Sequence, residues 1–521
     1  MSDSDESTPT SGVCIVRQSD DGREVLVARR PPDSGFLPGF HGFVVGRIQH
    51  SDGDLPFAPG GPFREPSREH WGCAVRELFE ETGLLPLKEG WISSWDPEPD
   101  IECPWGDWAE FRRHVCEGEI DFAAALDDAS FQVDAHRFHP VGHWTTPEWA
   151  DLDTTTEFFV VEAPAELTSA VSDHIDPAEH LDPQWVAPEM VVERWRRGEW
   201  FVSTPIRLVF EGIARMGELE DRDLLPPASQ RGRSSREMIE ILGGIRMLPL
   251  ATPTLPPATH TNCYIIGDNR LVLVDPGSDL ARECQLLTEA LESLIRARCF
   301  PDAVIVTHHH RDHVGGVTSL TDRFDIEVWA HEETAIHMPP ELAVDRFLED
   351  GEKIALDGED APVLEVLHTP GHAPGHVCLY EHQTRVLFAG DLVASKGTIL
   401  IDPDDGNMGE YLASLERVDD LELRAILPAH GTVIADPHRV LRHYVDHRND
   451  REEMVAQALA SKSGPAAPDE LVPEVYTDVP TTAWPLAVRS LHSHLIHLVE
   501  LGRARKVDRG FVYDSSSDSS T

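Results

Sequence analysis

The chain has 521 residues, 40% of them hydrophobic, so it is too long for one ordinary core and apolar enough to build several. It carries 44 Lys and Arg against 92 Asp and Glu, a formal net charge of −48, which disfavours polyanion binding unless a local basic patch outweighs the average. It has no apolar signal segment, no run long enough to span a membrane, and no CxxC pair among its eight cysteines. We therefore expect a multidomain cytoplasmic protein with reduced thiols and no membrane partner, and leave its oligomeric state open.

An acidic helix is predicted in the N-terminal half. The stretch CAVRELFEETGLL has the spacing RExxEExG, which places Glu77, Glu80 and Glu81 on one helix face. Like charges so placed repel unless a cation neutralises them, and hard cations such as Mg²⁺ prefer carboxylate oxygens. A solvated acidic face is the alternative; the added Arg76, and Gly83 at a C-terminal stop, favour a catalytic helix.

This helix resembles the signature of the Nudix hydrolases, which cleave diphosphates linked to another moiety. The resemblance implies a Nudix α/β/α sandwich over residues 10–217. It also implies that Glu77, Glu80 and Glu81 bind magnesium or manganese and that Arg76 orients the carboxylates.

The Nudix pattern is interrupted in this chain. Its glycine corresponds to Gly46, an insertion rich in Pro, Gly and Asp follows, and the upstream glutamate is not at its usual distance, Glu69 being only near it. The interruption resembles the acyl-coenzyme A diphosphatase branch, as do the later segments DTTTEFFVVEAP and WVAPEMVVERWRRGEW. A linker is predicted at 218–238, where charged residues, Pro and Ser replace large apolar ones.

Seven metal-binding side chains follow in the second half. They stand in the segments HHHRDH, TPGHAPGH, FAGDLV and LPAHG, each after a short apolar run that predicts a buried strand: 303–306, 363–367, 386–389 and 425–427. Loops at the carboxyl ends of strands are where α/β folds build sites, and imidazoles and carboxylates suit zinc. Chance pairing among 27 histidines is the alternative, which the repeated coincidence disfavours. The seven are His308, His310, Asp312, His313, His372, Asp391 and His430.

Residues from about 245 to 445 resemble the metallo-β-lactamase superfamily, and we place this domain at 239–445. The resemblance implies an αββα sandwich and a centre with two Zn²⁺ or similar ions. A water shared by two cations has its pKa lowered from about 15.7 toward 7. In this assignment His308, His310 and His372 hold one ion, Asp312, His313 and His430 the other, Asp391 bridges them, and Asp275 and His376 orient the ligands.

The C-terminal segment predicts three helices and a short β ribbon, a winged-helix-like module at 446–512. In the third helix Leu491, Leu495 and Leu498 fall on one face. Together with the segment after Asp391, this module resembles the β-lactamase-like protein 2 branch, whose best-known member is a single-strand endoribonuclease. Basic candidates for RNA contact are Arg503, Arg505, Lys506 and Arg509, for which a solvated wing is an equal alternative.

The fold class is thus α/β multidomain, and three functions stand. The favoured one is a bifunctional hydrolase, a diphosphatase fused to a dinuclear zinc hydrolase that acts on a thioester or other ester. We expect CoA-like or nucleotide-linked small molecules as its substrates, and acyl-CoA-like compounds are attractive because one site could cut the diphosphate and the other a thioester. The second is a single-strand endoribonuclease acting through the zinc site. In the third, the Nudix half is only a nucleotide-sensing or docking module beside the zinc hydrolase.

Overall fold

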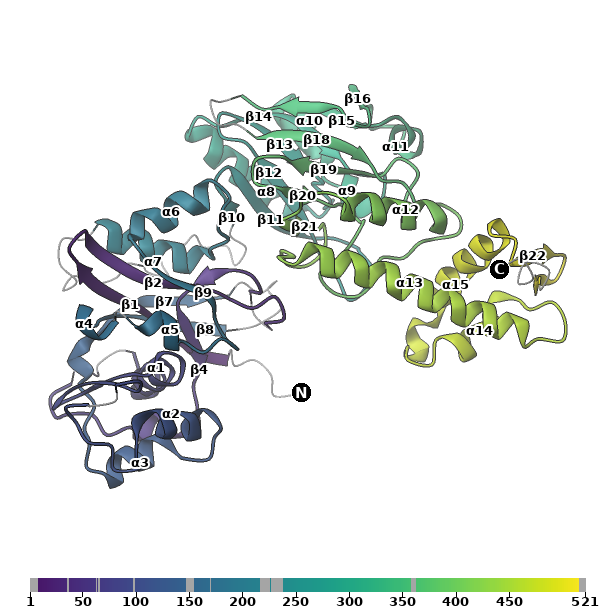
Figure 1. Cartoon of the computed structure of the whole chain (residues 1–521). Coiled ribbons are helices and arrows are strands. Elements are labelled where there is room, and N and C mark those ends of the chain that lie inside the picture. Colours follow the sequence, from purple (N-terminus) through teal and green to yellow (C-terminus); the bar gives the residue numbers. More distant parts are fainter. Residues whose placement is uncertain are drawn as a thin grey trace. The chain divides into compact units, whose positions relative to one another are not determined.

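A computed structural model describes residues 8–34, 37–61, 63, 66–96, 99–146, 154–168, 170–215, 225, 238–357 and 362–514. The chain divides into two compact units, Met1–Gly243 and Gly244–Thr521 (Figure 1). Apart from Leu225 and Met238, the linker expected at 218–238 lies outside the described residues. Within these ranges, no helix combines the length and apolar character required to cross a bilayer.

The first unit mixes strands and helices. Its strands are β1 (Thr8–Ser19), β2 (Gly22–Arg29), β3 (His41–Gly42), β4 (Val44–Arg47), β5 (Leu84–Leu87), β6 (Gly90–Ser93), β7 (Phe138–Thr145), β8 (Thr154–Glu162), β9 (Leu181–Val186) and β10 (Ile239–Leu242). Its helices are η1 (His50–Asp54), α1 (Arg68–Thr82), α2 (Trp108–Cys116), α3 (Phe122–Asp128), η2 (Ala135–Arg137), α4 (Ala165–Thr168), α5 (Val171–His174), α6 (Pro188–Arg196) and α7 (Thr204–Arg215).

A central sheet in this unit has helices on both faces. Its strand order is β3-β2-β1-β8-β7, with β4 beside β1 and β9 beside β2. The consecutive Phe158 and Phe159 of β8 point to opposite faces because side chains alternate along a strand. Phe159 contacts Trp71 of α1, whereas Phe158 contacts Phe43, which in turn contacts Phe210 of α7. The result is a three-layer α/β/α arrangement.

Helix α1 covers the range of the predicted acidic helix. It ends at Gly83, whose φ of 72° is left-handed and therefore suits glycine. Its apolar side chains, among them Trp71, Leu78 and Phe79, are fully buried in the core of the first unit. Burial of these side chains fixes where the helix presents its acidic residues.

The second unit contains two larger sheets and a ribbon. Its strands are β11 (Ile245–Ala251), β12 (His260–Ile266), β13 (Arg270–Val274), β14 (Phe300–Val306), β15 (Glu327–His331), β16 (Arg346–Leu348), β17 (Lys353–Ala355), β18 (Val363–His368), β19 (Val377–Glu381), β20 (Val386–Phe388), β21 (Ala425–Leu427), β22 (Ala504–Val507) and β23 (Gly510–Tyr513). Its helices are α8 (Ala281–Arg296), α9 (Arg311–Val314), α10 (Val317–Phe324), α11 (Glu332–His337), α12 (Met408–Asp419), α13 (Pro437–Ala460), α14 (Pro468–Val475), η3 (Thr481–Ala483) and α15 (Trp484–Glu500).

The two larger sheets pack face to face, as the predicted αββα sandwich requires. Six strands of the unit follow the order β11-β12-β13-β14-β15-β16, and the other sheet has the order β17-β18-β19-β20-β21. Tyr264 of β12 and Phe388 of β20 meet edge to face, with ring centroids 5.2 Å apart. Helices α8 and α10 pack on the first sheet, and α12 and α13 share a core with the second (Figure 1).

The four predicted strands that precede the metal-binding segments are confirmed as β14, β18, β20 and β21. Each ends within a few residues of a predicted metal-binding side chain. β14 runs parallel to β13, and β21 parallel to β20, so within each pair the carboxyl ends share one edge of a sheet. This register brings segments distant in sequence to one place.

The C-terminal module has the three helices and ribbon that the sequence predicts. Leu491, Leu495 and Leu498 of α15 are fully buried and pack with Val455 of α13 and Phe511 of β23. A single helix, α13, runs through the expected boundary between residues 445 and 446. The module is therefore joined to the sandwich by continuous helix.

Candidate functional site

Three imidazoles converge beside the ends of β14 and β18. Nε2 of His308 and Nε2 of His372 each lie 3.0 Å from Nδ1 of His310. Zinc–nitrogen bonds of 2.0–2.1 Å at a tetrahedral ion would place neighbouring nitrogens about 3.3 Å apart. The spacing of this first group therefore suits one small divalent ion.

A second group lies next to the first, with Asp391 between them. His430 Nε2 lies 3.6 Å from Asp312 Oδ2 and 3.2 Å from Asp391 Oδ1, and His313 Nε2 lies 3.4 Å from the same Asp391 oxygen. The other oxygen, Asp391 Oδ2, lies 3.5 Å from His372 Nε2 in the first group. The structure thus brings all seven predicted donors together, and the two oxygens of one carboxylate face different groups.

Partners outside the first group set which nitrogen of each ring carries the proton. Thr307 Oγ1 donates to Asp275, so at 3.0 Å it can accept from Nδ1 of His308. His310 Nε2 donates to Asp405 Oδ2 at 2.8 Å, and His372 Nδ1 donates to the carbonyl of Leu400 at 2.9 Å. Because one nitrogen of a neutral imidazole is a donor and the other an acceptor, the converging nitrogens keep their lone pairs.

In the second group, too, distant partners bond to one nitrogen of each imidazole. His313 Nδ1 donates to Asp275 Oδ2 at 2.8 Å, and His430 Nδ1 donates to the carbonyl of His260, also at 2.8 Å. Both Nε2 atoms consequently face Asp391. Asp275 thus contacts the nitrogen of His313 that faces away from Asp391.

His376 lies behind the site. Its Nε2 accepts from the backbone N–H of Asp391 at 3.0 Å, and its Nδ1 donates to the carbonyl of Thr369. Gly390, at φ 47°, leaves room for this contact, since a Cβ there would lie 2.7 Å from His376 Nε2. His376 therefore anchors the loop that carries Asp391.

The chemistry of the donor set fits divalent cations. His313 Nε2 and Asp391 Oδ1 are buried and have no hydrogen-bond partner among the described residues. Burial, reinforced by neighbouring imidazoles, lowers the pKa of His308 well below its usual value, and burial lowers the pKa of His372 to about 4. Both rings are thus neutral, the form that binds metals.

Asp405 is a contact of the site that the sequence interpretation missed. Its Oδ2 lies 2.8 Å from Nε2 of His310 and 3.4 Å from Nε2 of His309. The available signal was the run DPDDG after Asp391, but its clustered acids are typical of a solvated turn. Only the folded loop distinguishes Asp405 from its neighbours.

A second acidic cluster lies in the first unit and centres on Arg76. The buried guanidinium donates to Glu77 and Glu80, both at 2.7 Å, and through Nε and Nη2 to the two oxygens of Asp52 at 2.8 and 3.1 Å. Asp52 is buried in η1, and Glu69 is exposed. The upstream acidic partner of Arg76 is thus Asp52 and not Glu69, and an acid shortly after Gly46 was the available signal.

Gly46 fits closely against this cluster. A Cβ at Gly46 would lie 1.8 Å from the carboxyl carbon of Glu77. Burial, with Glu81 and Glu80 nearby, raises the pKa of Glu77 to about 8 despite Arg76. A carboxylate in such surroundings gains from a neighbouring cation.

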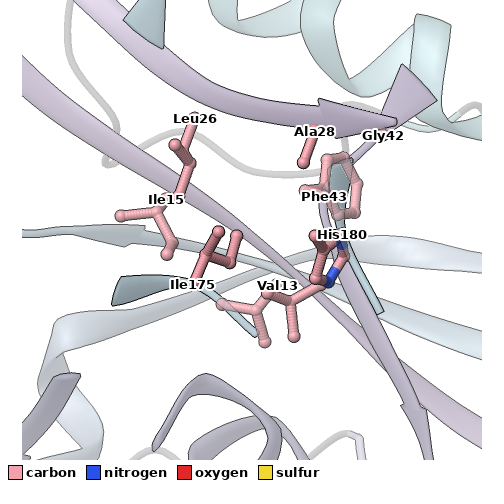
Figure 2. Close-up of a pocket in the computed structure, with 9 residues that line it drawn as sticks. Val13, Ile15, Leu26, Ala28, Gly42, Phe43, Ile175 and His180 are labelled. Carbon is pink, nitrogen blue, oxygen red and sulfur yellow. The ribbon is translucent and has the colours of Figure 1, made fainter. Parts of the chain in front are cut away.

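Glu81 is directed elsewhere. It bonds to Nε2 of the buried His180, and among the described residues Glu77, Glu80 and Glu81 do not form a group whose ligand atoms all lie within 4.8 Å. His180 is the polar member of a small, otherwise apolar hollow whose lining includes Val13, Phe43 and Ile175 (Figure 2). Glu77 and Glu80 therefore both bond to Arg76. Glu81 instead bonds to His180, which lines the hollow.

Comparison with known families matches two segments of the second unit. The metallo-beta-lactamase superfamily matches residues 256–430, and the beta-lactamase associated winged helix domain matches residues 467–511. The chain is 30% identical to the Beta-lactamase-like protein 2 homolog of Drosophila melanogaster over 54% of this chain and 93% of that protein. It is 28% identical to the Atrochrysone carboxyl ACP thioesterase of Aspergillus chevalieri over 54% of this chain and 86% of that one.

Solved structures give weaker likenesses. A metallo-beta-lactamase family protein of Thermus thermophilus aligns with 53% of this chain and 100% of its own, at 25% identity and a TM-score of 0.44. A NUDIX hydrolase of Alicyclobacillus acidocaldarius aligns with 42% of this chain and 99% of its own, at 19% identity and a TM-score of 0.34.

Proposed function

Because the chain belongs to the metallo-beta-lactamase superfamily and is a hydrolase of that superfamily, we propose that its second unit holds two zinc or similar divalent ions and hydrolyses a small-molecule thioester or other ester. One observation carries the proposal. The carboxylate of Asp391 presents one oxygen to each of two groups of donors whose lone pairs converge.

The residues divide into roles by position. His308, His310 and His372 would hold one ion, and Asp312, His313 and His430 the other, with Asp391 between them. When bound, such ions lower the pKa of water and polarise a scissile carbonyl. Asp312, whose side chain is not fully enclosed, would also orient the attacking water, and Asp275 and His376 would keep the donors in place.

Two observations favour thioesters over RNA as substrates: the names of several relatives and the charge of the chain. Several relatives carry the name Atrochrysone carboxyl ACP thioesterase. Of the four basic residues considered for RNA, Arg503 pairs with Glu453 and Arg505 with Asp514, in a chain of net charge −48. Paired cations attract a polyanion poorly, so single-strand RNA cleavage is the less supported activity.

The test uses the purified full-length protein. We expect zinc-dependent release of free thiol from acyl thioesters, loss of this activity on chelation, and its return with zinc. Asp391→Asn should abolish it, whereas His382→Gln, which alters an exposed histidine paired with Glu365, should leave it unchanged. Cleavage of unstructured RNA with thioesters left intact would contradict the proposal.

We further propose that the first unit is a Nudix-type hydrolase of a diphosphate such as coenzyme A or an acyl-CoA. Its domain would span residues 10–217, ahead of the sandwich domain at 239–445 and the C-terminal module at 446–512. The Arg76 cluster favours it, because one guanidinium fixes Glu77 and Glu80 where a hard cation such as Mg²⁺ or Mn²⁺ could join them. Glu81 would join the two only on leaving His180. An acyl-CoA would offer its diphosphate to one unit and its thioester to the other.

The diphosphatase proposal has its own test. Glu80→Gln combined with Glu81→Gln should remove magnesium-dependent diphosphate cleavage, while Glu69→Gln, an exposed change on the same helix, should not. Unchanged cleavage in the double variant would refute the assigned roles. Nucleotide binding without cleavage in the unaltered protein would instead support a sensing module.

A further inference from the structure

One segment, residues 399–407 after Asp391, contacts both the metal-binding histidines and the C-terminal module. On the side of the histidines, the carbonyl of Leu400 accepts from His372 Nδ1 at 2.9 Å, and Asp405 Oδ2 accepts from His310 Nε2 at 2.8 Å. Both contacts engage the non-converging nitrogen of a first-group ligand. The segment thus determines which nitrogen of His310 and of His372 faces the ion.

Helices α13 and α15 hold the other side of the segment. Arg448 of α13 donates to the carbonyl of Ile399, and Ser493 of α15 donates to that of Ile401 at 2.6 Å. The carbonyls of three consecutive residues, 399, 400 and 401, therefore point alternately to the module, to the site and to the module. The backbone cannot shift on one side without disturbing the other.

Arg489 of α15 fastens the acidic part of the segment. Its guanidinium bonds both oxygens of Asp402 and, at 3.0 Å, Asp404 Oδ2. Asp404 and Asp405 adjoin in sequence, so Arg489 neutralises acids that would otherwise repel the carboxylate serving His310. A planar bidentate contact of this kind also fixes direction, which a lysine would not do equally well.

We propose that the C-terminal module positions two metal ligands through residues 399–407, with Asp405 and Arg489 as positioning residues. The module is then part of the catalytic apparatus as well as any substrate-binding surface. This inference rests on the proposed metal centre. It assigns a specific task to a segment whose acids are typical of a solvated turn in the sequence.

The test measures zinc affinity of the full-length protein by competition with a chromophoric chelator. We expect Asp405→Ala to weaken the binding of one zinc equivalent by about 10–100-fold and Arg489→Gln by a smaller factor, at least about threefold, with partial recovery in Arg489→Lys. Hydrogen exchange of residues 399–407 should rise in Arg489→Gln. Arg503→Gln is the matched control, because it breaks an ion pair in the same module without touching the segment.

The outcomes separate the two ideas. Wild-type zinc affinity and unchanged exchange in Asp405→Ala and Arg489→Gln would overturn the positioning role alone. Failure of the unaltered protein to bind zinc would overturn the proposed metal centre and this inference with it. Equal weakening in Arg503→Gln would reveal a general effect of module stability and would also refute the specific role.

Discussion

The carboxylate of Asp275 accepts a hydrogen bond of 2.8 Å from Nδ1 of His313, and both residues are fully buried. The same carboxylate accepts from the hydroxyl and backbone N–H of Thr307, and that hydroxyl lies 3.0 Å from His308 Nδ1. One side chain therefore orients a donor in each of the two groups.

Replacing Asp275 should disturb both groups at once. Asp275→Asn places an amide N–H₂ group opposite the N–H and O–H donors that now bond to the carboxylate. It also removes the negative charge that orients His313. We expect zinc affinity to fall by about 10–100-fold, as for other carboxylates behind a ligating histidine. Equilibrium competition with a chelator measures the zinc affinity. The control is Asp279→Asn, because Asp279 is exposed and pairs with Arg311. Wild-type affinity would argue against the orienting role.

Arg76 is expected to be the most costly single charge to remove in the first unit. Arg76→Met would leave buried Asp52 and Glu77, with the partly buried Glu80, facing one another without a cation. Breaking buried pairs in this way costs about 3–5 kcal/mol, against at most about 1 kcal/mol for a surface pair such as Arg113–Glu117. Denaturant unfolding of Arg76→Met and Arg113→Met, without added divalent cations, compares them. Equal midpoints would contradict the expectation.

Gly46 should be required for the position of Glu77. A methyl group at Gly46 would overlap the Glu77 carboxylate, whereas one at Gly53 would lie 3.3 Å from the flexible side chain of Glu69. We expect Gly46→Ala to reduce magnesium-dependent diphosphate cleavage by about 10–100-fold, and Gly53→Ala to change it little. The measurement is the rate of diphosphate cleavage by each variant at saturating magnesium. Full activity in Gly46→Ala would show that Glu77 does not need its observed place.

The stability contributed by the contact between α13 and α15 should depend on pH. Burial raises the pKa of Glu452, but the hydrogen bond with His497 and the neighbouring imidazole of His494 outweigh this effect and lower that pKa to about 2. The bond with Glu452 raises the pKa of His497. The depressed carboxyl contributes stability above its unfolded pKa of about 4.3, lost as pH falls toward 2. The raised imidazole contributes below its unfolded pKa of about 6.5, lost as pH rises through the folded value.

The contribution of this pair is therefore greatest between about pH 4.3 and 6.5. Glu452→Gln should lower the melting temperature most in that window and flatten its pH dependence. Glu453→Gln, at the exposed neighbour paired with Arg503, is the control. A uniform shift at every pH would count against the titrating pair.

Much of the architecture could be predicted from local pattern. Short apolar runs before the metal-binding segments became β14, β18, β20 and β21, and Gly83 became the end of α1, because burial and backbone conformation act on neighbouring residues. Leu491, Leu495 and Leu498 repeat at helical spacing and are buried in α15. These signals span few residues, so a single chain displays them.

The sequence by itself determined which side chains are candidate metal ligands and in what order they stand, since imidazole and carboxylate groups offer ligand atoms wherever they occur. Only the tertiary structure decided which nitrogen of each ring faces the centre, because that choice belongs to distant partners such as Asp275 for His313 and Asp405 for His310. It likewise selected Asp52 over Glu69 as the partner of Arg76. Hydrogen bonds between remote segments form only after the chain has packed, and sequence spacing carries no record of them.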